Sequence, residues 1–186
     1  MNRSKRHTSI IRTADPAGAE LRRRLDFDDA QLLAECDVHH HRTGGPGGQH
    51  RNKVSTAVRL YHRPAGITVT GTERRSQQEN RIHALRRLRE AIAVYTRMPL
   101  PARVVWPATV QIVEGRLSVN PRNPAVYHVI GLVLDAIYAF DGSVRAAAGF
   151  LGVTPSSLTR FLAEHPKAWA EANRIRMERG VRPLRS

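Results

Sequence analysis

The chain has 186 residues, of which 41% are hydrophobic, so it can build a folded core and is not disordered throughout. The formal net charge of +14, carried mainly by arginine, indicates a polyanionic partner. Nucleic acid is favoured over a membrane surface, because the chain has no run of 18 apolar residues and its cations do not follow one amphipathic helix. The single cysteine, Cys36, excludes a disulfide framework and a cysteine-based zinc site, and it fits a reducing, cytoplasmic location.

The N-terminal segment is expected to be an arm followed by short helices. Residues 1–19 are polar and basic, and they are predicted to be disordered. They lack the apolar segment of a secretory signal, and Asp15 and Pro16 interrupt any helix of an organellar transit peptide. Over residues 20–36 leucines share a helical face, with a break at residues 27–29 where an aspartate can cap a second helix.

A glycine-rich stretch separates two predicted strands, residues 37–42 and 56–62. It reads Arg42-Thr43-Gly44-Gly45-Pro46-Gly47-Gly48-Gln49-His50-Arg51-Asn52-Lys53. Four glycines around one proline cannot continue a helix or a central strand, so this stretch is predicted to be a loop. A flexible linker would be followed by more glycine and serine. A phosphate-binding loop would need lysine where Gln49 stands, so nucleotide hydrolysis is not expected.

A third strand, residues 67–71, is predicted to return antiparallel after a turn at residues 63–66. Ser76 and Glu79 have the spacing of a capping box that opens a long helix, and the prolines after Met98 end it. Apolar residues of this helix are expected to cover the sheet, namely Ile82, Leu85, Leu88, Ile92 and Tyr95. Its outward face is predicted to carry Arg81, Arg86, Arg87 and Arg89.

Positive charge is concentrated around this part of the chain. From Arg42 to Arg97 there are 12 lysines or arginines against 3 aspartates or glutamates, a net charge of +9. We interpret this excess as a nucleic-acid-binding patch rather than a scatter of solvated side chains.

The C-terminal part is predicted to be helical after a proline-rich connector, residues 101–125, in which a hairpin can form across Glu114-Gly115. An apolar helix is expected over residues 126–140. Residues 143–162 have the pattern of a helix-turn-helix, with small alanines, a glycine at the turn and a capped second helix. This pattern is typical of small DNA-binding units, but a helical bundle without a nucleic-acid role remains an alternative.

Two motifs together resemble the class I peptide chain release factors. Their GGQ loop is G-x-G-G-Q followed by His or Asn, a small aliphatic residue, Asn, and Ser or Thr opening a strand. The matching residues are Gly45, Gly47, Gly48, Gln49, His50, Asn52 and Thr56. A second block of the family is matched by Arg74, Arg75, Ser76, Gln77, Asn80, Arg81, Ala84 and Leu85. Arg51 stands where the family usually has valine or isoleucine.

The resemblance implies a catalytic loop that acts on the ester of peptidyl-tRNA in the peptidyl-transferase centre of the large ribosomal subunit. The implied catalytic residues are Gly47, Gly48 and Gln49. The implied RNA-binding residues are Arg42, His50, Arg51, Asn52, Lys53, Arg74, Arg75, Ser76, Gln77, Asn80 and Arg81. No cofactor and no metal are expected, because the adjacent histidines 39–41 point to opposite faces of a strand.

The predicted fold class is α+β, a small antiparallel sheet that carries the glycine loop and is packed by a long helix, followed by an all-α module. The expected domains are a basic arm (1–19), a catalytic domain (20–100), a connector (101–125) and a helix-turn-helix-like module with a basic end (126–186).

The expected partners are the ribosome, including its ribosomal RNA, and peptidyl-tRNA, and the protein is expected to be a monomer. One short helical segment and an arm cannot build a codon-reading domain before the loop, so the chain is similar to the ribosome-rescue peptidyl-tRNA hydrolases and codon-independent release is expected. The alternative is a non-enzymatic RNA- or DNA-binding regulator that uses the helix-turn-helix-like module.

Overall fold

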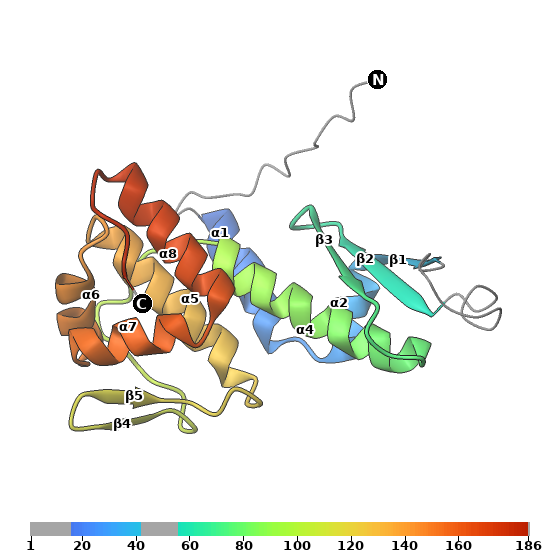
Figure 1. Ribbon diagram of the computed structural model, residues 1–186. Coiled ribbons are helices and arrows are strands. Elements are labelled where there is room, and N and C mark those ends of the chain that lie inside the picture. The colour runs from blue at the N-terminus through green and yellow to red at the C-terminus, as the bar shows by residue number, and fades with distance from the viewer. Residues whose placement is uncertain (1–15, 42–55, 186) are drawn as a thin grey trace. The chain divides into compact units, whose positions relative to one another are not determined.

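The computed structural model describes residues 16–41 and 56–185, and the helices and strands of these residues form the expected α+β fold (Figure 1). In chain order the elements are α1 (Pro16–Arg22), the 3-10 helix η1 (Arg23–Asp26), α2 (Asp29–Ala34), β1 (Cys36–His41), β2 (Ala57–His62), β3 (Ile67–Gly71), α4 (Gln77–Tyr95), β4 (Gln111–Val113), β5 (Arg116–Ser118), α5 (Ala125–Ala139), α6 (Val144–Leu151), α7 (Pro155–Ala163) and α8 (Pro166–Glu178). None of the helices in the described ranges combines the length and the hydropathy that a membrane span requires.

The described residues pack as two units. The first comprises residues 23–41 and 56–92, and the second comprises residues 16–22 and 93–185. Helix α4 belongs to the first unit up to Ile92, and its last turn is counted with the second.

The first unit is built on an antiparallel sheet with strand order β1-β2-β3. The central strand alternates as predicted, because Val58 and Leu60 are fully buried while Arg59 and Tyr61 are exposed. The turn before β3 is also confirmed: the Gly66 N–H donates to the carbonyl of Arg63 at 3.4 Å, and Gly66 has a φ of 62° that glycine adopts readily.

Helix α4 begins as its sequence predicts, with the Ser76 hydroxyl accepting from the Glu79 N–H at 3.4 Å. Leu85 and Leu88 are buried, whereas Ile82 is 36% exposed and does not join the core. Arg89 differs from its predicted position on the outward face.

Arg89 is 9% exposed, and its guanidinium donates to Asp29 at 2.7 Å and to the carbonyl of Phe27 at 2.9 Å. The prediction that it faces outward is wrong, because a long arginine stem can lie along apolar surface while its head reaches a carboxylate of another element. Arg87 is half-exposed, yet it also bonds within the unit, to Glu73 and to the carbonyl of Thr70.

A buried histidine links α2, β2 and the turn that follows β2. His62 is fully buried, its Nε2 lies 2.9 Å from Glu35, and its Nδ1 accepts from the Ala65 N–H at 3.2 Å. Since Nδ1 accepts, the single ring proton is on Nε2 and is donated to Glu35. Burial lowers the pKa of His62 below 6.5, although Glu35 opposes this shift and Arg24 and Arg63 add to it.

This shift predicts that the free energy of unfolding falls as the pH is lowered below 6.5. The unfolded chain then binds a proton that the folded His62 binds only at lower pH, so the slope contributed by this group is at most about 1.4 kcal/mol per pH unit. Urea unfolding followed by far-UV circular dichroism between pH 7.5 and 5 measures it. His62→Gln should flatten the slope, while His39→Gln, which changes an exposed residue of β1, should leave it unchanged.

The second unit contains the predicted hairpin and helix-turn-helix. In the hairpin, Glu114 and Gly115 have φ values of 51° and 73°, as a two-residue turn between twisted strands requires. Ser143 and Thr154 cap α6 and α7 by accepting from Ala146 and Ser157, and Gly152 between the helices has a φ of 69°. Helix α5 is buried along most of its length, as its apolar sequence predicts.

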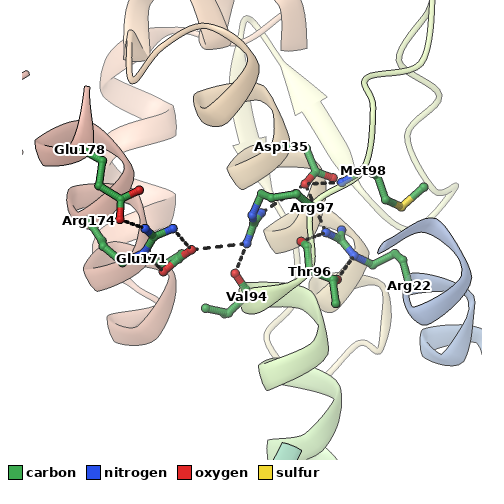
Figure 2. A network of polar contacts seen from close by, with 9 residues as sticks. All are labelled: Arg22, Val94, Thr96, Arg97, Met98, Asp135, Glu171, Arg174 and Glu178. Carbon is green, nitrogen blue, oxygen red and sulfur yellow. Dashed lines mark hydrogen bonds and ion pairs between the residues drawn. The ribbon is translucent and has the colours of Figure 1, made fainter. Parts of the chain in front are cut away.

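The second unit also holds a buried ionic network that the sequence did not indicate (Figure 2). It joins α1, the segment after α4, α5 and α8 through two arginines and two carboxylates, all with side chains at most 7% exposed: Arg22, Arg97, Asp135 and Glu171. Asp135 accepts from Arg22 at 3.3 Å, from Arg97 at 3.2 Å and from the Met98 N–H at 3.1 Å. The two positive and two negative charges balance inside the unit.

The rest of the network satisfies the remaining donors. Arg22 also donates to the hydroxyl and the carbonyl of Thr96 at 3.0 and 2.7 Å, and Arg174 bonds to both oxygens of Glu171 at 2.8 and 2.7 Å. Burial lowers the pKa of Arg97 to about 10, so this side chain is still charged at neutral pH. Gly131 of α5 leaves space for the guanidinium of Arg22, because a Cβ at this position would lie 1.4 Å from it.

Candidate functional site

The glycine-rich segment joins two neighbouring strand ends of the first unit. Strand β1 ends at His41 and β2 begins at Ala57, and these two residues are paired across the sheet. The segment between them therefore begins and ends at the same end of the hydrogen-bonded β1–β2 pair.

Several predicted site residues lie in this segment, outside the described residues. They are the expected catalytic residues Gly47, Gly48 and Gln49 and the expected RNA-binding residues Arg42, His50, Arg51, Asn52 and Lys53. The described part of the candidate site is the frame around them, formed by Thr56, the turn after β3 and the first turns of α4.

Asn80, in the first turns of α4, holds two segments of this frame together. Its side chain is fully buried, and its amide nitrogen donates to the carbonyls of Thr56 and Arg74, both at 2.8 Å. Its amide oxygen accepts from the Arg74 N–H, also at 2.8 Å. One acceptor and two donated bonds use the asparagine amide in a way that an aspartate, leucine or alanine cannot reproduce.

Asn80 was expected among the RNA-binding residues, and the structure places its side chain inside the frame. Thr56, the first described residue after the glycine-rich segment, is thereby tied to the start of α4. The signal that could have indicated this role is that asparagine, a residue that favours caps and turns, occurs inside a predicted helix.

The end of β3 approaches the same helix turn at backbone distance. A Cβ at Gly71 would lie 2.0 Å from the carbonyl oxygen of Asn80 and 3.2 Å from the Ala84 nitrogen. Only glycine allows this approach without displacing backbone, so Gly71 and Asn80 together determine where α4 begins relative to the sheet.

The remaining predicted RNA-binding residues surround this buried point. Arg74, Arg75 and Gln77 are exposed, whereas Ser76 and Arg81 are partly buried. The Nε of Arg81 is buried and has no hydrogen-bond partner among the described residues, so its donor capacity is incompletely used there.

The cations of the first unit fall into two groups. Four arginines are paired with carboxylates: Arg24 with Glu35, Arg63 with Asp37, Arg87 with Glu73, and Arg89 with Asp29. The side chains of a second group have no hydrogen bond or ion pair with any described residue, and they are the exposed Arg59, Arg74, Arg75 and Arg86. The second group leaves uncompensated positive charge on the first unit, and Arg74 and Arg75 lie in the frame itself, as a polyanion site requires.

Glu73, the carboxylate next to Arg74 in the sequence, does not neutralise it. Glu73 bonds to Arg87 and accepts from the Thr72 N–H at 3.0 Å. The pKa of Glu73 lies below 4.5; burial raises it, but the backbone hydrogen bonds and Arg87 together lower it further. Glu73 is therefore ionised at neutral pH and its charge is compensated by Arg87, which leaves Arg74 and Arg75 to face solvent.

The frame can thus hold a loop in place and attract phosphate. Glu73, the carboxylate of the turn after β3, is engaged by Arg87 and is not arranged as a general base. Chemistry at this site would come from the loop itself or from the bound partner.

Comparison with known proteins shows a similarity that includes most of the first unit. Residues 32–103 match the family model described as the RF-1 domain. The chain is 37% identical over 146 residues to peptide chain release factor 1 of Symbiobacterium thermophilum, covering 74% of this chain and 39% of that protein. It is 51% identical over 123 residues to peptide chain release factor 1 of Lacticaseibacillus casei, covering 60% and 34%. It is 42% identical over 86 residues to that of Chloroherpeton thalassium, covering 46% and 23%. The chain therefore spans well under half the length of these relatives.

Proposed function

We propose that this protein, whose residues 32–103 match the RF-1 domain, is a member of the class I release-factor family and promotes hydrolysis of the ester bond of peptidyl-tRNA on the ribosome. The observation that carries the proposal is that one matched domain contains both the loop with Gly47, Gly48 and Gln49 and the buried Asn80 that ties the loop's end to α4.

The proposed chemistry uses the loop and the substrate rather than acid and base side chains. Glycines let the backbone approach the terminal adenosine of the tRNA closely, and the backbone N–H of Gln49 would stabilise the oxyanion that develops when water attacks the ester. The Gln49 side chain would orient that water and exclude larger nucleophiles. The frame supports this role because a loop anchored at both ends can hold a reacting geometry.

We propose further that release does not depend on a stop codon. Residues 16–41, which precede the loop among the described residues, are taken up by the packing of the two units: Leu21 and Leu25 are buried, and Arg22 lies in the ionic network. None of these residues forms a separate module that could inspect a codon. The protein would then act on stalled ribosomes, as a monomer and without a cofactor.

Substitution of Gln49 tests the proposed activity. Wild-type protein is expected to release peptide from ribosomes stalled at the end of a truncated message, and Gln49→Ala is expected to release none above background while still binding those ribosomes. Gln78→Ala, which changes an exposed glutamine of α4, should release peptide like the wild type. Equal release of peptide by the wild type and by Gln49→Ala would refute the proposed enzymatic activity.

The same assay separates codon-independent from codon-dependent release. Ribosomes carrying a truncated message and ribosomes paused at a stop codon are compared at equal concentration. We expect release from the truncated complexes without a stop codon. If peptide is released only from the stop-codon complexes, the proposed hydrolysis stands and the proposed independence from the stop codon is refuted.

The unpaired cations predict how the protein binds ribosomes. Replacing both Arg74 and Arg75 by alanine is expected to weaken binding and to reduce the slope of log affinity against log salt by about 1 for each arginine that contacts a phosphate. Sedimentation with ribosomes at several salt concentrations measures this slope. The control is the double variant in which Arg63 and Arg87 are replaced by alanine, because these arginines are paired with carboxylates and the loss of charge is the same. A slope that changes equally in both double variants would place the phosphate contacts elsewhere.

A second candidate function is favoured by one observation. The helix-turn-helix predicted for the second unit is present, so a non-enzymatic RNA- or DNA-binding regulator is the alternative. Absence of peptide release from every ribosomal complex, together with retained binding to nucleic acid, would favour this alternative.

A further inference from the structure

The β-hairpin of the second unit is fastened to the start of the second helix of the helix-turn-helix. The Thr154 N–H donates to the carbonyl of Gly115 at 2.8 Å, and the Leu117 N–H donates to the hydroxyl of Ser157 at 2.8 Å. Between the hairpin turn and α7 lies a hollow of about 300 Å³. It is lined by Glu114, Arg116, Thr154, Ser156, Ser157 and Arg160.

Three of the donors that line this hollow, on Arg116, Ser157 and Arg160, have no acceptor within the described protein. Arg116 comes from β5 and Arg160 from α7, both are exposed, and neither side chain has a hydrogen bond or an ion pair with a described residue. Ser157 is 8% exposed, and its hydroxyl accepts from Leu117 while its own proton has no acceptor among the described residues. A buried hydroxyl with a free proton indicates a missing acceptor.

The single anion of the lining does not compensate the arginines. Glu114 stands at the hairpin turn, where its side chain has no hydrogen bond or ion pair with the described residues. Two guanidinium groups and one carboxylate leave the hollow with a net positive charge.

We propose that this hollow binds a backbone phosphate of a polynucleotide, with Arg116 and Arg160 on the phosphate oxygens and the Ser157 hydroxyl as a third donor. Guanidinium groups suit phosphate because they offer parallel N–H donors in a plane. A polynucleotide is favoured over a free anion because the hollow lies beside the second helix of a helix-turn-helix, the element that such units place against nucleic acid.

The contact is with the backbone rather than with base edges. Besides Arg160, the exposed residues of α7 are Pro155, Ser156 and Ala163. Specific base contacts mostly use Arg, Lys, Asn or Gln, so this surface is suited to position the second unit on nucleic acid without reading a sequence.

Binding of the whole chain to a 20-base-pair duplex tests the proposal. The duplex is prepared once as RNA and once as DNA, each labelled so that binding is measured by fluorescence anisotropy. The Arg116→Ala, Arg160→Ala double variant is expected to bind at least one of them several-fold more weakly, and to show a salt slope smaller by about 1 for each arginine that contacts a phosphate. Glu114→Asn, which keeps a residue that tolerates positive φ, is expected to bind more tightly. The difference between the RNA and DNA arms identifies the polynucleotide.

Two controls keep the test independent of the first unit. All measurements are made in the Arg74→Ala, Arg75→Ala background, which removes two unpaired cations of the first unit from the binding measurement. Arg182→Ala with Arg185→Ala removes the same charge elsewhere in the second unit. A loss of affinity as large in this control as in the hollow variant, or an unchanged salt slope in the hollow variant, overturns the proposal. The proposal is also overturned if millimolar inorganic phosphate competes with the duplex while the variants bind the duplex as the unsubstituted background does.

Discussion

Asp135→Asn is expected to lower the free energy of unfolding of the second unit by about 3–5 kcal/mol. Asp135 is 4% exposed and is the shared acceptor for Arg22, Arg97 and the Met98 N–H. The substitution keeps the shape of the side chain and removes its charge. The one remaining buried carboxylate, Glu171, lies 3.9 Å from Arg97 and is already bonded to Arg174, so a positive charge would be left buried without a charged partner.

Such a loss is a large fraction of the roughly 5–15 kcal/mol by which domains are stable, so this variant should unfold at clearly lower urea concentration. Tryptophan fluorescence reports this unit specifically, because both tryptophans, Trp106 and Trp169, lie in it. The matched control is Asp141→Asn, the same change at an exposed aspartate 3.5 Å from Arg179, which is expected to cost less than about 1 kcal/mol. Equal midpoints for the two variants would show that the network carries no net stabilisation.

Asn80→Ala is expected to cost about 2–4 kcal/mol in the first unit and to release the end of the loop from α4. The substitution deprives the Thr56 carbonyl and both backbone groups of Arg74 of their partner, and each buried group left unpaired costs about 1–3 kcal/mol before water replaces the bond. Asn80→Asp should be no better, because its oxygens can accept from the Arg74 N–H but would face two carbonyl oxygens.

Amide hydrogen exchange read by mass spectrometry localises this effect. Faster exchange is expected in peptides that cover residues 56–62 and 72–80, with the peptides of α5 unchanged. Gln78→Ala, two positions earlier and exposed, is the control and should exchange like the wild type. If the proposed function holds, Asn80→Ala should also release less peptide at saturating ribosome concentration. Unchanged exchange in both peptides would mean that Asn80 is not the tie between them.

Local patterns in the sequence determined the elements of this protein. Strand alternation in residues 57–62, the serine that opens α4, the glycine between α6 and α7 and the apolar run of α5 each report on neighbours within a few positions, and all four are confirmed. The glycine loop and the second block with Asn80 and Arg81 indicated the resemblance to release factors, and both lie within residues 32–103, which match the RF-1 domain.

Only the tertiary structure decided which charged residues are available to a partner. In the sequence Arg74, Arg87 and Arg89 are equivalent cations, yet Arg89 is buried against Asp29, which lies 60 positions away, and Arg87 bonds to Glu73. Arg22 and Asp135 pair across 113 positions, where Gly131 gives the guanidinium its space. A charge is free or paired according to which distant residues the fold brings within about 4 Å, and periodicity along the chain contains no information about such distances.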